Sequence, residues 1–355
     1  MNKAWILNLL RMKGMSRRKL GHLEEGLGGL DVLLHATYEE LVDLEVPPSL
    51  ARTIVQERDL AKWEEAIAGW ADKGIYTLAL CDPRLPDWVR EIPDPPRLLF
   101  AAGRIDELGQ MKKRIAVVGT RHPSPYGRKM ARTIARDLAK SGAAVVSGMA
   151  YGIDGEAHKG ALDADGFTIA VLGNGVDMAY PKSNQALYDQ IYMRGVVLSE
   201  HPPGTPPLAH HFPERNRIVA ALSNGLLVIE AAKKSGALIT AEMAMEQGRT
   251  LFALPSNVGH AVSEGTLALL REGAIPVGSA DHINEDMGWD RILSGEKKRH
   301  SDYPILQVLH QHGSQSVDEI AHRLEMDTAL ALSSLTMLEI QGSVIRGPGG
   351  TYSTR

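Results

Sequence analysis

The sequence has 355 residues, of which 44% are hydrophobic and 23% are charged, as is typical of a soluble globular protein with two or three domains. The formal net charge of −4 excludes a global attraction to polyanions, so a nucleic-acid site would require a local concentration of basic residues. The single cysteine, Cys81, excludes an intramolecular disulfide framework and a multi-cysteine zinc site.

Residues 1–68 are predicted to form a small helical domain. A leucine-rich stretch runs from Leu20 to Leu44, and Pro47 and Pro48 precede the apolar pattern of a further helix. The apolar run AWILNLL is short for a targeting peptide, basic residues follow it, and no small-residue cleavage site is present. No run approaches the roughly 18 apolar residues of a membrane span. We therefore expect a cytoplasmic protein.

From about Arg114, short β-branched runs alternate with helix-length segments. This alternation predicts an α/β fold, in which helices cover both faces of a parallel sheet. The proline-rich segment from Ala79 to Gly103 ends in the strand-like LLFAAG and is interpreted as an extension of the same domain, predicted to span residues 69–285. The runs are RIAVVG, AAVVSG, TIAVLG, GVVLSE, GLLVIE and TLFALP.

The C-terminal part of the chain has a different pattern. Residues 286–302 lack apolar periodicity and are predicted to be a linker. Residues 303–355 have the pattern of three helices and a glycine-rich hairpin, which is typical of a winged helix. No Lys or Arg lies between Arg323 and Arg346, although a helix that reads the DNA major groove normally presents cations. We therefore expect this domain to serve protein contacts or regulation.

Four loops that follow the predicted strands combine small residues with a cation or a hydroxyl. In an open parallel sheet, such loops meet at one edge and lead into helix N-termini, which carry free N–H groups and a partial positive charge. Together they predict an extended anion-binding rim. Neither the dinucleotide G-x-G-x-x-G spacing nor a GxxxxGK[ST] loop is present. The loops are Gly119–Lys129, Ser147–Asp154, Gly173–Asn184 and Glu230–Thr240.

Several cations of these loops are candidate phosphate contacts. Arg121 follows a strand directly and lies in a run, residues 112–136, that has eight basic residues and no acid. Lys234 is favoured over Lys233 because it immediately precedes Ser235, which can cap a helix, and Gly236, which lets backbone approach a ligand. Lys182, in the YPKSN segment, is a comparable candidate.

Arg215 and Arg217 are two positions apart, so on a regular helix they point roughly 200° away from each other. We expect one of them at or before the helix cap, facing a ligand. The other is expected to pair with a carboxylate such as Glu230 or Glu200. The alternative is that both form structural salt bridges.

Acidic, histidine and aromatic residues near these loops are interpreted as structural. The acids are expected to orient arginines or to satisfy loop amides, although a hydrolase would also keep its acids there. His158 lies on the same helix face as Asp154, but a metal site is not expected. Met149 and Phe212 are interpreted as packing residues, and stacking of a base on an exposed Phe212 stays open. The acids are Asp154, Asp177, Glu200 and Glu230.

Several motifs occur in order over roughly residues 75–280: GTR, SGMAYGID, GNGVDMAYP, SE before a proline-rich loop, FPERNRIVAALS, and VIEAAKKSGALITAEMA followed by GR and ALP. Together they resemble the bacterial DNA-processing protein A family (DprA, also called Smf). The resemblance implies an extended Rossmann-like domain that binds single-stranded DNA, forms homodimers and helps to load the RecA recombinase in natural transformation. It implies neither enzymatic activity nor a cofactor. The DNA-binding positions that it implies are Gly119, Arg121, Ser147, Gly148, Lys182, Arg215, Asn216, Arg217, Lys234, Ser235 and Gly236.

The sequence departs from the family pattern at two places. Family members commonly have a helix-hairpin-helix or sterile-alpha-motif-like domain before the core, and the hairpin normally has glycine where this chain has Glu45. The missing glycine argues against a phosphate held by this hairpin's backbone amides. The segment ALPSN also replaces a more usual proline-glycine turn.

Two other classes of function remain alternatives. One is an enzyme that acts on a nucleotide or a phosphoribosyl compound at the same strand ends. The chain lacks the PGGxGT loop of the related phosphoribohydrolases. The other is a transcription regulator whose sheet domain senses a metabolite, but the winged helix lacks the cations that such a role requires.

Overall fold

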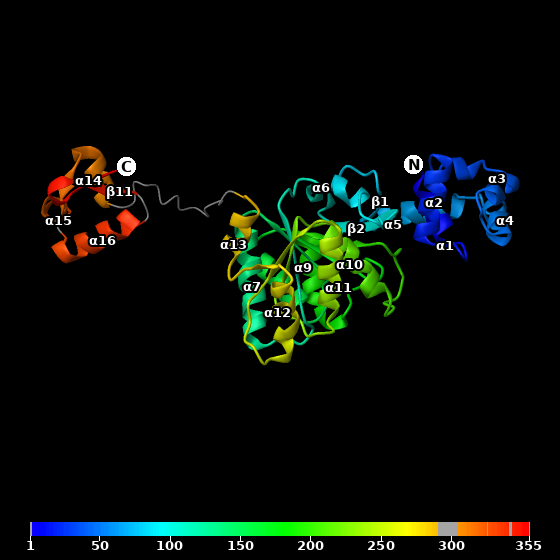
Figure 1. The fold of residues 1–355 in the computed structure, drawn as a ribbon. Helices are drawn as coiled ribbons and strands as arrows, with labels where there is room; N and C mark the ends of the chain where they lie inside the picture. The colour runs from blue at the N-terminus through cyan, green and yellow to red at the C-terminus, as the bar shows by residue number, and fades with distance from the viewer. Residues whose placement is uncertain (1, 290–303, 325, 341–342, 355) are drawn as a thin grey trace. The chain divides into compact units, whose positions relative to one another are not determined.

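A computed structural model of the chain describes residues 2–289, 304–324, 326–340 and 343–354. The chain divides into two compact units, residues 1–292 and residues 293–355 (Figure 1). Of the predicted linker, residues 290–302 lie outside the described residues. The domain boundaries predicted at residues 68 and 285 stay predictions. No helix in the described ranges is long and apolar enough to cross a membrane.

The first unit contains a nine-stranded sheet with the order β1-β2-β6-β5-β4-β3-β7-β8-β9. All neighbours from β6 to β9 in this order are parallel, and β1 and β2 extend the sheet with antiparallel pairs. The predicted α/β fold is therefore confirmed. The strands are β1 Ile75–Ala79, β2 Leu98–Gly103, β3 Arg114–Val118, β4 Ala144–Ser147, β5 Thr168–Leu172, β6 Val196–Ser199, β7 Gly225–Val228, β8 Thr250–Ala253 and β9 Ile275–Pro276.

The strand order reverses next to β3. The chain proceeds from β3 outward through β4, β5 and β6, and then returns to place β7 on the other side of β3. Loops from the two halves diverge at such a reversal and leave a crevice at the carboxyl ends of the strands, where α/β proteins bind ligands. The fold therefore places a candidate site at the ends of β3 and β7.

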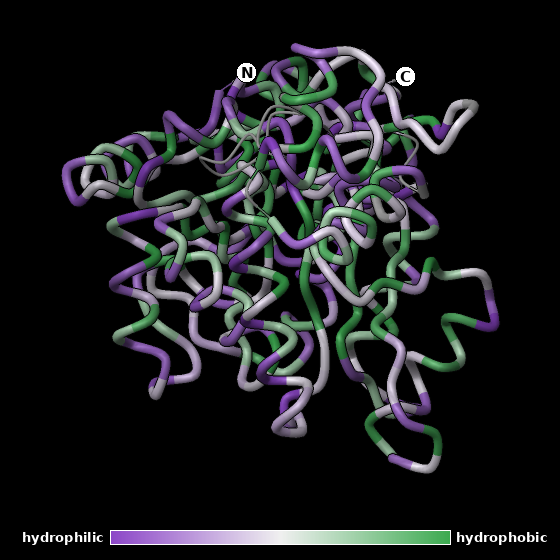
Figure 2. Tube along the Cα trace, turned by 90° about the vertical axis from the view of Figure 1, so that its left-hand side faces the viewer, coloured by the Kyte–Doolittle hydropathy of each residue, from purple (hydrophilic) through white to green (hydrophobic). Residues whose placement is uncertain are grey.

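Helices cover both faces of the sheet because the strands are apolar on both sides. On β3, Ile115 and Val117 pack with one set of helices, whereas Ala116 and Val118 belong to the core on the opposite face. Figure 2 shows hydrophilic and hydrophobic residues alternating along the outer helices. One face is covered by α7 Pro125–Lys140, α8 Ile153–Asp163 and α13 Ala280–Asp286, and the other by α10 His211–Ala221, α11 Gly236–Glu246 and α12 Glu264–Arg271.

The N-terminal helices share a core with one end of the sheet. Side chains of these helices cluster with residues of β1, β2 and α9 (Gln185–Arg194), and the ring of Trp70 meets that of Phe100 edge-on with centroids 5.4 Å apart. The predicted helix after Pro47 is confirmed, with Pro48 at its first position. The helices are α1 Lys3–Arg11, α2 Arg17–Leu27, α3 Tyr38–Asp43, α4 Pro48–Gln56 and α5 Ala61–Ala71.

Glu45 adopts the left-handed backbone conformation, with φ of 59°, in the turn between α3 and α4. Glycine takes this conformation without steric cost, whereas a residue with a Cβ does so at a cost of about 1 kcal/mol or more. The N–H groups of Glu45 and Val46 donate to the carbonyls of Val42 and Leu41. The turn therefore keeps its tight shape without glycine, and these two amides are already bonded within the chain.

The second unit has the predicted winged-helix pattern. Three helices pack around Leu306, Ile320, Leu335 and Tyr352. On α16, Leu330 and Leu332 are 58% and 46% exposed. The unit's three-stranded sheet has the order β10-β12-β11. Its elements are α14 Pro304–His312, β10 Gln315–Ser316, α15 Val317–Arg323, α16 Thr328–Ile340, β11 Val344–Arg346 and β12 Thr351–Thr354.

Short helices complete the described fold. They are α6 Ile105–Leu108, η1 Val32–Leu34, η2 Asp87–Arg90, η3 Lys182–Asn184, η4 Ala261–Ser263 and η6 Pro348–Gly350.

The contact between α7 and α8 gives a first prediction. A Cβ on Gly160 of α8 would lie 2.3 Å from the backbone oxygen of Arg132 on α7. We expect Gly160→Ala to lower the free energy of unfolding by about 1–3 kcal/mol, because the two helix backbones must move apart.

Gly69→Ala on α5 is the matched control, since nothing lies within 4 Å of its added Cβ. We expect this control to be neutral or stabilising by up to about 1 kcal/mol. Urea denaturation measures both values, and equal stability of the two variants would contradict the prediction.

Candidate functional site

A pocket of about 350 Å³ lies at the strand reversal, and we call it the switch-point pocket. The loops after β3 and β4, the first turns of α10 and the start of α11 line it. Four loops or helix starts that are far apart in the sequence therefore meet at one place. The predicted binding residues that line the pocket are Gly119, Arg121, Gly148, Arg215, Asn216, Ser235 and Gly236.

Two glycines of the pocket are required by close packing. A Cβ on Gly148 would lie 2.3 Å from a guanidinium nitrogen of Arg215, and a Cβ on Gly119 would lie 2.6 Å from the Ile153 side chain. Gly236 differs, because nothing lies within 4 Å of its added Cβ. At Gly148 and Gly119, the space that a Cβ would need is filled by neighbouring side chains. At Gly236 that space is open, so the backbone at the start of α11 is accessible.

Arg215 is a buried cation at the inner wall of the pocket. Its side chain donates hydrogen bonds to the carbonyl oxygens of Gly148, at 2.7 Å, and Val171. Burial lowers the pKa of Arg215 to about 10, with Asp154 acting in the opposite direction, so the guanidinium remains charged at neutral pH. One of Arg215 and Arg217 was expected at or before the helix cap, and this was wrong: α10 begins at His211, so both lie inside the helix. The guanidinium is held by fixed carbonyl groups rather than by a mobile loop.

Asp154, in the first turn of α8, interacts electrostatically with Arg215. Its carboxylate accepts a hydrogen bond from the backbone N–H of Gly148 at 3.1 Å. Burial raises the pKa of Asp154, while the charge of Arg215 and the backbone N–H groups lower it. The expectation that acids near the strand ends satisfy loop amides is confirmed for this residue.

Arg121 is the exposed cation of the pocket. Its guanidinium lies 6.0 Å from the centre of the Phe212 ring, within the range of a cation–π contact. Phe212 is half-buried, and its ring also packs on that of Tyr180 with centroids 5.3 Å apart. The predicted packing role of Phe212 is confirmed. The contact with Phe212 therefore holds the Arg121 side chain at the pocket, and its guanidinium remains exposed to solvent.

The start of α11 supplies further positive potential. Ser235 is the N-cap residue, and its side chain accepts a hydrogen bond from the N–H of Ala237 at 3.3 Å. Lys233 and Lys234 are exposed immediately before the cap. The helix dipole and these two cations act in the same direction, which favours an anion at this end of the helix.

Lys182 lies outside the switch-point pocket, in the short helix η3 after β5. The Lys182 side chain is exposed. Asn184 of the same helix donates a hydrogen bond to the carbonyl oxygen of Met149 at 3.0 Å, which ties this loop to the one after β4. Met149 is fully buried, so its predicted packing role is confirmed. Lys182 therefore extends the cationic edge beyond the pocket.

The structure corrects the placement of two predicted contacts, Ser147 and Arg217. Ser147 is fully buried, and its hydroxyl donates to the carbonyl oxygen of Val117 at 2.7 Å. Arg217 is buried on the opposite side of α10, where it donates to both carboxylate oxygens of Glu200 at 2.7 and 2.8 Å. The predicted pairing of one arginine with Glu200 is confirmed. Neither Ser147 nor Arg217 lines the switch-point pocket.

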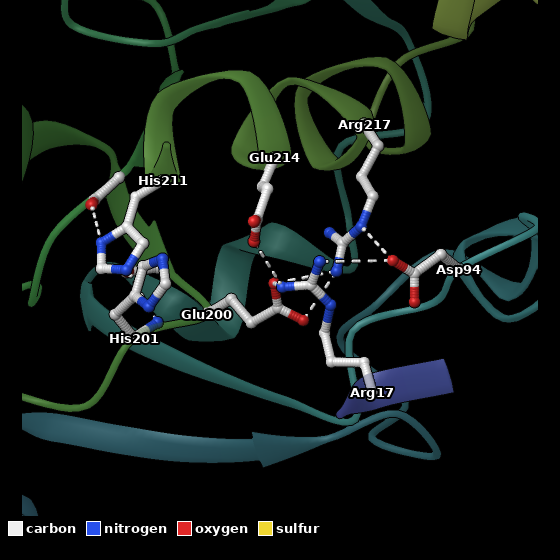
Figure 3. A network of polar contacts seen from close by, with 9 residues as sticks. Arg17, Asp94, Glu200, His201, His211, Glu214 and Arg217 are labelled. Atoms are coloured by element: carbon white, nitrogen blue, oxygen red, sulfur yellow. Dashed lines mark hydrogen bonds and ion pairs between the residues drawn. The ribbon is translucent and has the colours of Figure 1, made fainter. Parts of the chain in front are cut away.

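Arg217 belongs to a group of charges that we call the Arg17 network (Figure 3). Arg17, from α2, lies 3.0 Å from both Glu200 and Glu214 and 3.3 Å from Asp94. Arg217 also lies 3.3 Å from Asp94. The network therefore connects the N-terminal helices to α10. Sequence reasoning missed Arg17, because its partners are nearly 200 residues away for Glu200 and Glu214.

The basic run of residues 112–136 is a smaller surface patch than its sequence suggests. Arg114 is buried and donates to the carbonyl oxygen of Leu108 at 2.7 Å. Arg132 is 2.5 Å from Asp163, and Arg136 is 2.9 Å from Asp137. Folding thus brings Asp163 next to Arg132, Asp137 pairs with its chain neighbour Arg136, and Arg114 is taken into the interior.

Glu230 holds the loop after β3. Its carboxylate accepts hydrogen bonds from the backbone N–H of Ser124 at 2.9 Å and from the Ser124 hydroxyl at 2.5 Å, and its backbone carbonyl accepts one from the N–H of Thr120 at 2.7 Å. Of the two carboxylates named as candidate partners for an arginine of the RNR segment, Glu200 is the one that pairs with Arg217.

His158 is a fully buried histidine behind the site. Thr168 donates its hydroxyl hydrogen to Val145, so the neighbouring Nδ1 of His158, 2.7 Å from that hydroxyl, is assigned as the donor to it. Burial, reinforced by the charge of Arg215, lowers the pKa of His158 to about 3. The ring is therefore neutral at physiological pH. Within the described ranges, no three His, Cys, Asp or Glu side chains form a group that would hold a metal ion.

Comparisons with known proteins show one family for both parts of the chain. A family model described as DNA recombination-mediator protein A matches residues 76–288, and one described as DprA winged helix domain matches residues 302–350. DNA processing protein DprA of Bacillus subtilis is 38% identical over 231 residues, which are 65% of this chain and 77% of the relative. Protein Smf of Escherichia coli is 36% identical over 299 residues, 81% of this chain and 79% of the relative.

Two solved structures are similar over most of their length. DNA processing protein A from Streptococcus pneumoniae has a TM-score of 0.71 and 35% sequence identity, covering 81% of this chain and 98% of that chain. DNA processing protein A from Helicobacter pylori, studied for its single-stranded DNA binding mode, has a TM-score of 0.55 and 33% identity, covering 60% of this chain and 95% of that chain.

The burial of Arg217 gives a prediction for stability. Arg217→Ala removes the charge-assisted hydrogen bonds to Glu200 and leaves Arg17 as the cation for both Glu200 and Asp94, so we expect the free energy of unfolding to fall by about 2 kcal/mol. Arg132→Ala is the control, because its pair with Asp163 is half exposed and should contribute less than about 1 kcal/mol. Urea denaturation at neutral pH distinguishes the two. A loss for Arg217→Ala no greater than that of the control would contradict the buried network.

The neutral His158 predicts acid sensitivity. Its pKa is about 3 in the folded protein and about 6.5 when unfolded, so only the unfolded state takes up a proton between these values. Stability should therefore be fully present above pH 6.5 and fall as the pH decreases, by about 2 kcal/mol from this group between pH 7 and pH 5. In His158→Gln, we expect the difference in unfolding free energy between pH 7 and pH 5 to shrink by that amount. An unchanged difference would show that His158 is not the group responsible.

Proposed function

This chain belongs to the DNA-processing protein A (DprA/Smf) family, and we propose that it binds single-stranded DNA along the carboxyl edge of its sheet. The observation that carries the proposal is the convergence of Arg121, Arg215 and the start of α11 on the switch-point pocket. These groups favour a phosphate. The similar structure from H. pylori was described for its single-stranded DNA binding mode, which also supports the proposal.

The cations of the site divide into fixed and mobile groups. Arg215 is buried and held by two carbonyl oxygens, so it loses little side-chain entropy when a phosphate arrives. Arg121, Lys182 and Lys234 are exposed and can follow the strand along the edge. Phosphates are the same in every sequence, so binding should depend strongly on salt and little on base sequence.

The proposed DNA contacts are therefore not all of those predicted from the family motifs. Gly119, Gly148 and Gly236 shape the pocket, and Asn216 and Ser235 line it. Ser147 and Arg217 are assigned to the scaffold because the Ser147 hydroxyl bonds to Val117 and Arg217 pairs with Glu200, both within the protein.

The partners follow from the family. We propose a cytoplasmic homodimer that protects incoming single-stranded DNA and loads the RecA recombinase during natural transformation and recombination. Two edges in one dimer would raise the avidity for a long strand. The exposed Leu330 and Leu332 of α16, a helix without Lys or Arg, support protein contacts for the second unit rather than strong duplex binding.

We also propose that the protein is not an enzyme. The acid of the switch-point pocket is Asp154, which is buried, accepts from the N–H of Gly148 and is attracted to Arg215. These interactions support a role in orienting the cation. An enzyme that processes a nucleotide or a phosphoribosyl compound would be favoured if purified protein released a product from such a substrate and Asp154→Asn abolished the release.

Substitution of the proposed contacts tests the function. We expect Arg121→Ala and Lys234→Ala each to weaken binding of single-stranded DNA about fivefold, the equivalent of roughly 1 kcal/mol for one charge-assisted contact. Each should also reduce the slope of log K against log salt by about 0.7. Lys233→Ala is the matched control, because it removes the same exposed charge next to the helix cap and should have a smaller effect.

Fluorescence anisotropy with labelled single-stranded and duplex oligonucleotides over a salt series measures these quantities. The proposed function is contradicted by weak, salt-insensitive binding that neither Arg121→Ala nor Lys234→Ala changes.

A further inference from the structure

A second pocket, of about 490 Å³, lies farther along the same edge of the sheet, and we call it the rim pocket. It is lined by the first turn of α7, by Glu230 after β7, and by the loop that follows β8. Arg121 and His122 line the switch-point pocket, whereas Ser124 and Tyr126 line the rim pocket. Three residues of extended chain span about 10 Å, so a single DNA strand is long enough to reach both pockets.

Glu230 separates the two pockets. Its backbone carbonyl holds the N–H of Thr120 on the switch-point side, and its carboxylate holds the N–H and hydroxyl of Ser124 on the rim side. This carboxylate occupies the N-terminus of α7, since a Cβ on Gly127 would lie 2.3 Å from one of its oxygens. Only 2% of Glu230 is exposed.

The carboxylate makes the rim pocket unsuitable for a phosphate. The positive end of the α7 dipole is already matched by the charge of Glu230, and a phosphate entering the pocket would be repelled by the same charge. The switch-point pocket has the opposite character, because Arg121, Arg215 and the open start of α11 converge there. The two neighbouring pockets thus differ in charge: the rim pocket contains a carboxylate, and the switch-point pocket contains two guanidinium groups.

The remaining groups of the rim pocket match a nucleobase. Tyr126 is 49% exposed, so one face of its ring is available for stacking. Asn257 and His260 are exposed on the loop after β8 and line the same pocket. The amide offers both a donor and an acceptor, and the imidazole adds two ring nitrogens that can form hydrogen bonds. The lining thus combines a flat ring with polar groups and contains no Lys or Arg. Such a lining suits a neutral aromatic ligand that has polar edges.

We propose that the rim pocket receives a base of the DNA strand whose phosphates occupy the switch-point pocket, and that this base stacks on Tyr126. The inference rests on the proposed function, since it concerns the same strand. Because stacking uses the face of the base, the pocket tolerates all four bases. Glu230 directs the strand, as it keeps phosphates on one side and leaves a base as the group that enters on the other.

The test compares Tyr126→Ala with Tyr126→Phe, measured by fluorescence anisotropy on the full chain. We expect Tyr126→Ala to weaken binding of a thymidine homopolymer about fivefold or more, as loss of one stacked base does. Tyr126→Phe keeps the ring and should bind like the parent protein. Tyr76→Ala, which removes an exposed tyrosine from the edge strand β1, is the matched control and should change nothing.

A polymer of abasic residues separates stacking from any other effect of the substitution. On this polymer, Tyr126→Ala and the parent protein should bind equally, whereas Arg121→Ala should still weaken binding, because the phosphates are unchanged. If Tyr126→Ala weakens both polymers alike, or neither, while Arg121→Ala weakens both, the base pocket is wrong and the proposed function survives. If neither substitution weakens binding of either polymer, the proposed function fails and this inference with it.

Discussion

The arrangement of the site depends on one buried cation, the guanidinium of Arg215. An arginine that leaves water must find partners for its N–H groups, and here the carbonyl oxygens of Gly148 and Val171 accept from it at the ends of β4 and β5. Gly148 must lack a side chain, because the guanidinium fills that space. Asp154 supplies the nearby negative charge. The loop after β4, the start of α8 and helix α10 are therefore all fixed by the requirement to bury one charge.

Helix α10 meets this requirement while it anchors a different part of the chain. Arg215 and Asn216 line the switch-point pocket, whereas Glu214 and Arg217 belong to the Arg17 network on the other side. The network has three carboxylates and two arginines, so every charge has an opposite partner within 4 Å. Removing Arg217 would leave Asp94 and Glu200 with Arg17 alone, whereas removing Arg17 would leave Glu214 without a cation in the network.

Much of the central fold is predictable from the sequence because its strands are buried on both faces. Six apolar runs of four to five residues correspond to β3 through β8. The sequence does not predict β1 and β9: they lie at the two edges of the sheet, β9 has only two residues, and Tyr76 makes β1 partly polar and exposed. Edge strands pair on one side only, so their apolar signal is weak.

The candidate site was predictable where a residue's role follows from its place after a strand, as for Arg121, Gly148 and Gly236. It was not predictable where the role depends on a distant partner. Nothing near Arg217 in the sequence indicates Asp94 or Arg17, and nothing near Arg132 indicates Asp163. The start of α10 was also missed, because the apolar pattern begins at Ile218 and His210 makes no side-chain capping bond.

The two faces of α10 have a mechanical consequence. Arg215 on one side and Glu214 and Arg217 on the other project from a single helix of eleven residues, so any shift of the helix moves both sets together. A roll of the helix about its axis would shorten contacts on one face and stretch them on the other. Thermodynamic reciprocity then links the two contacts. If separating α2 from α10 lowers the affinity for DNA by some factor, bound DNA strengthens the attachment of α2 to α10 by the same factor.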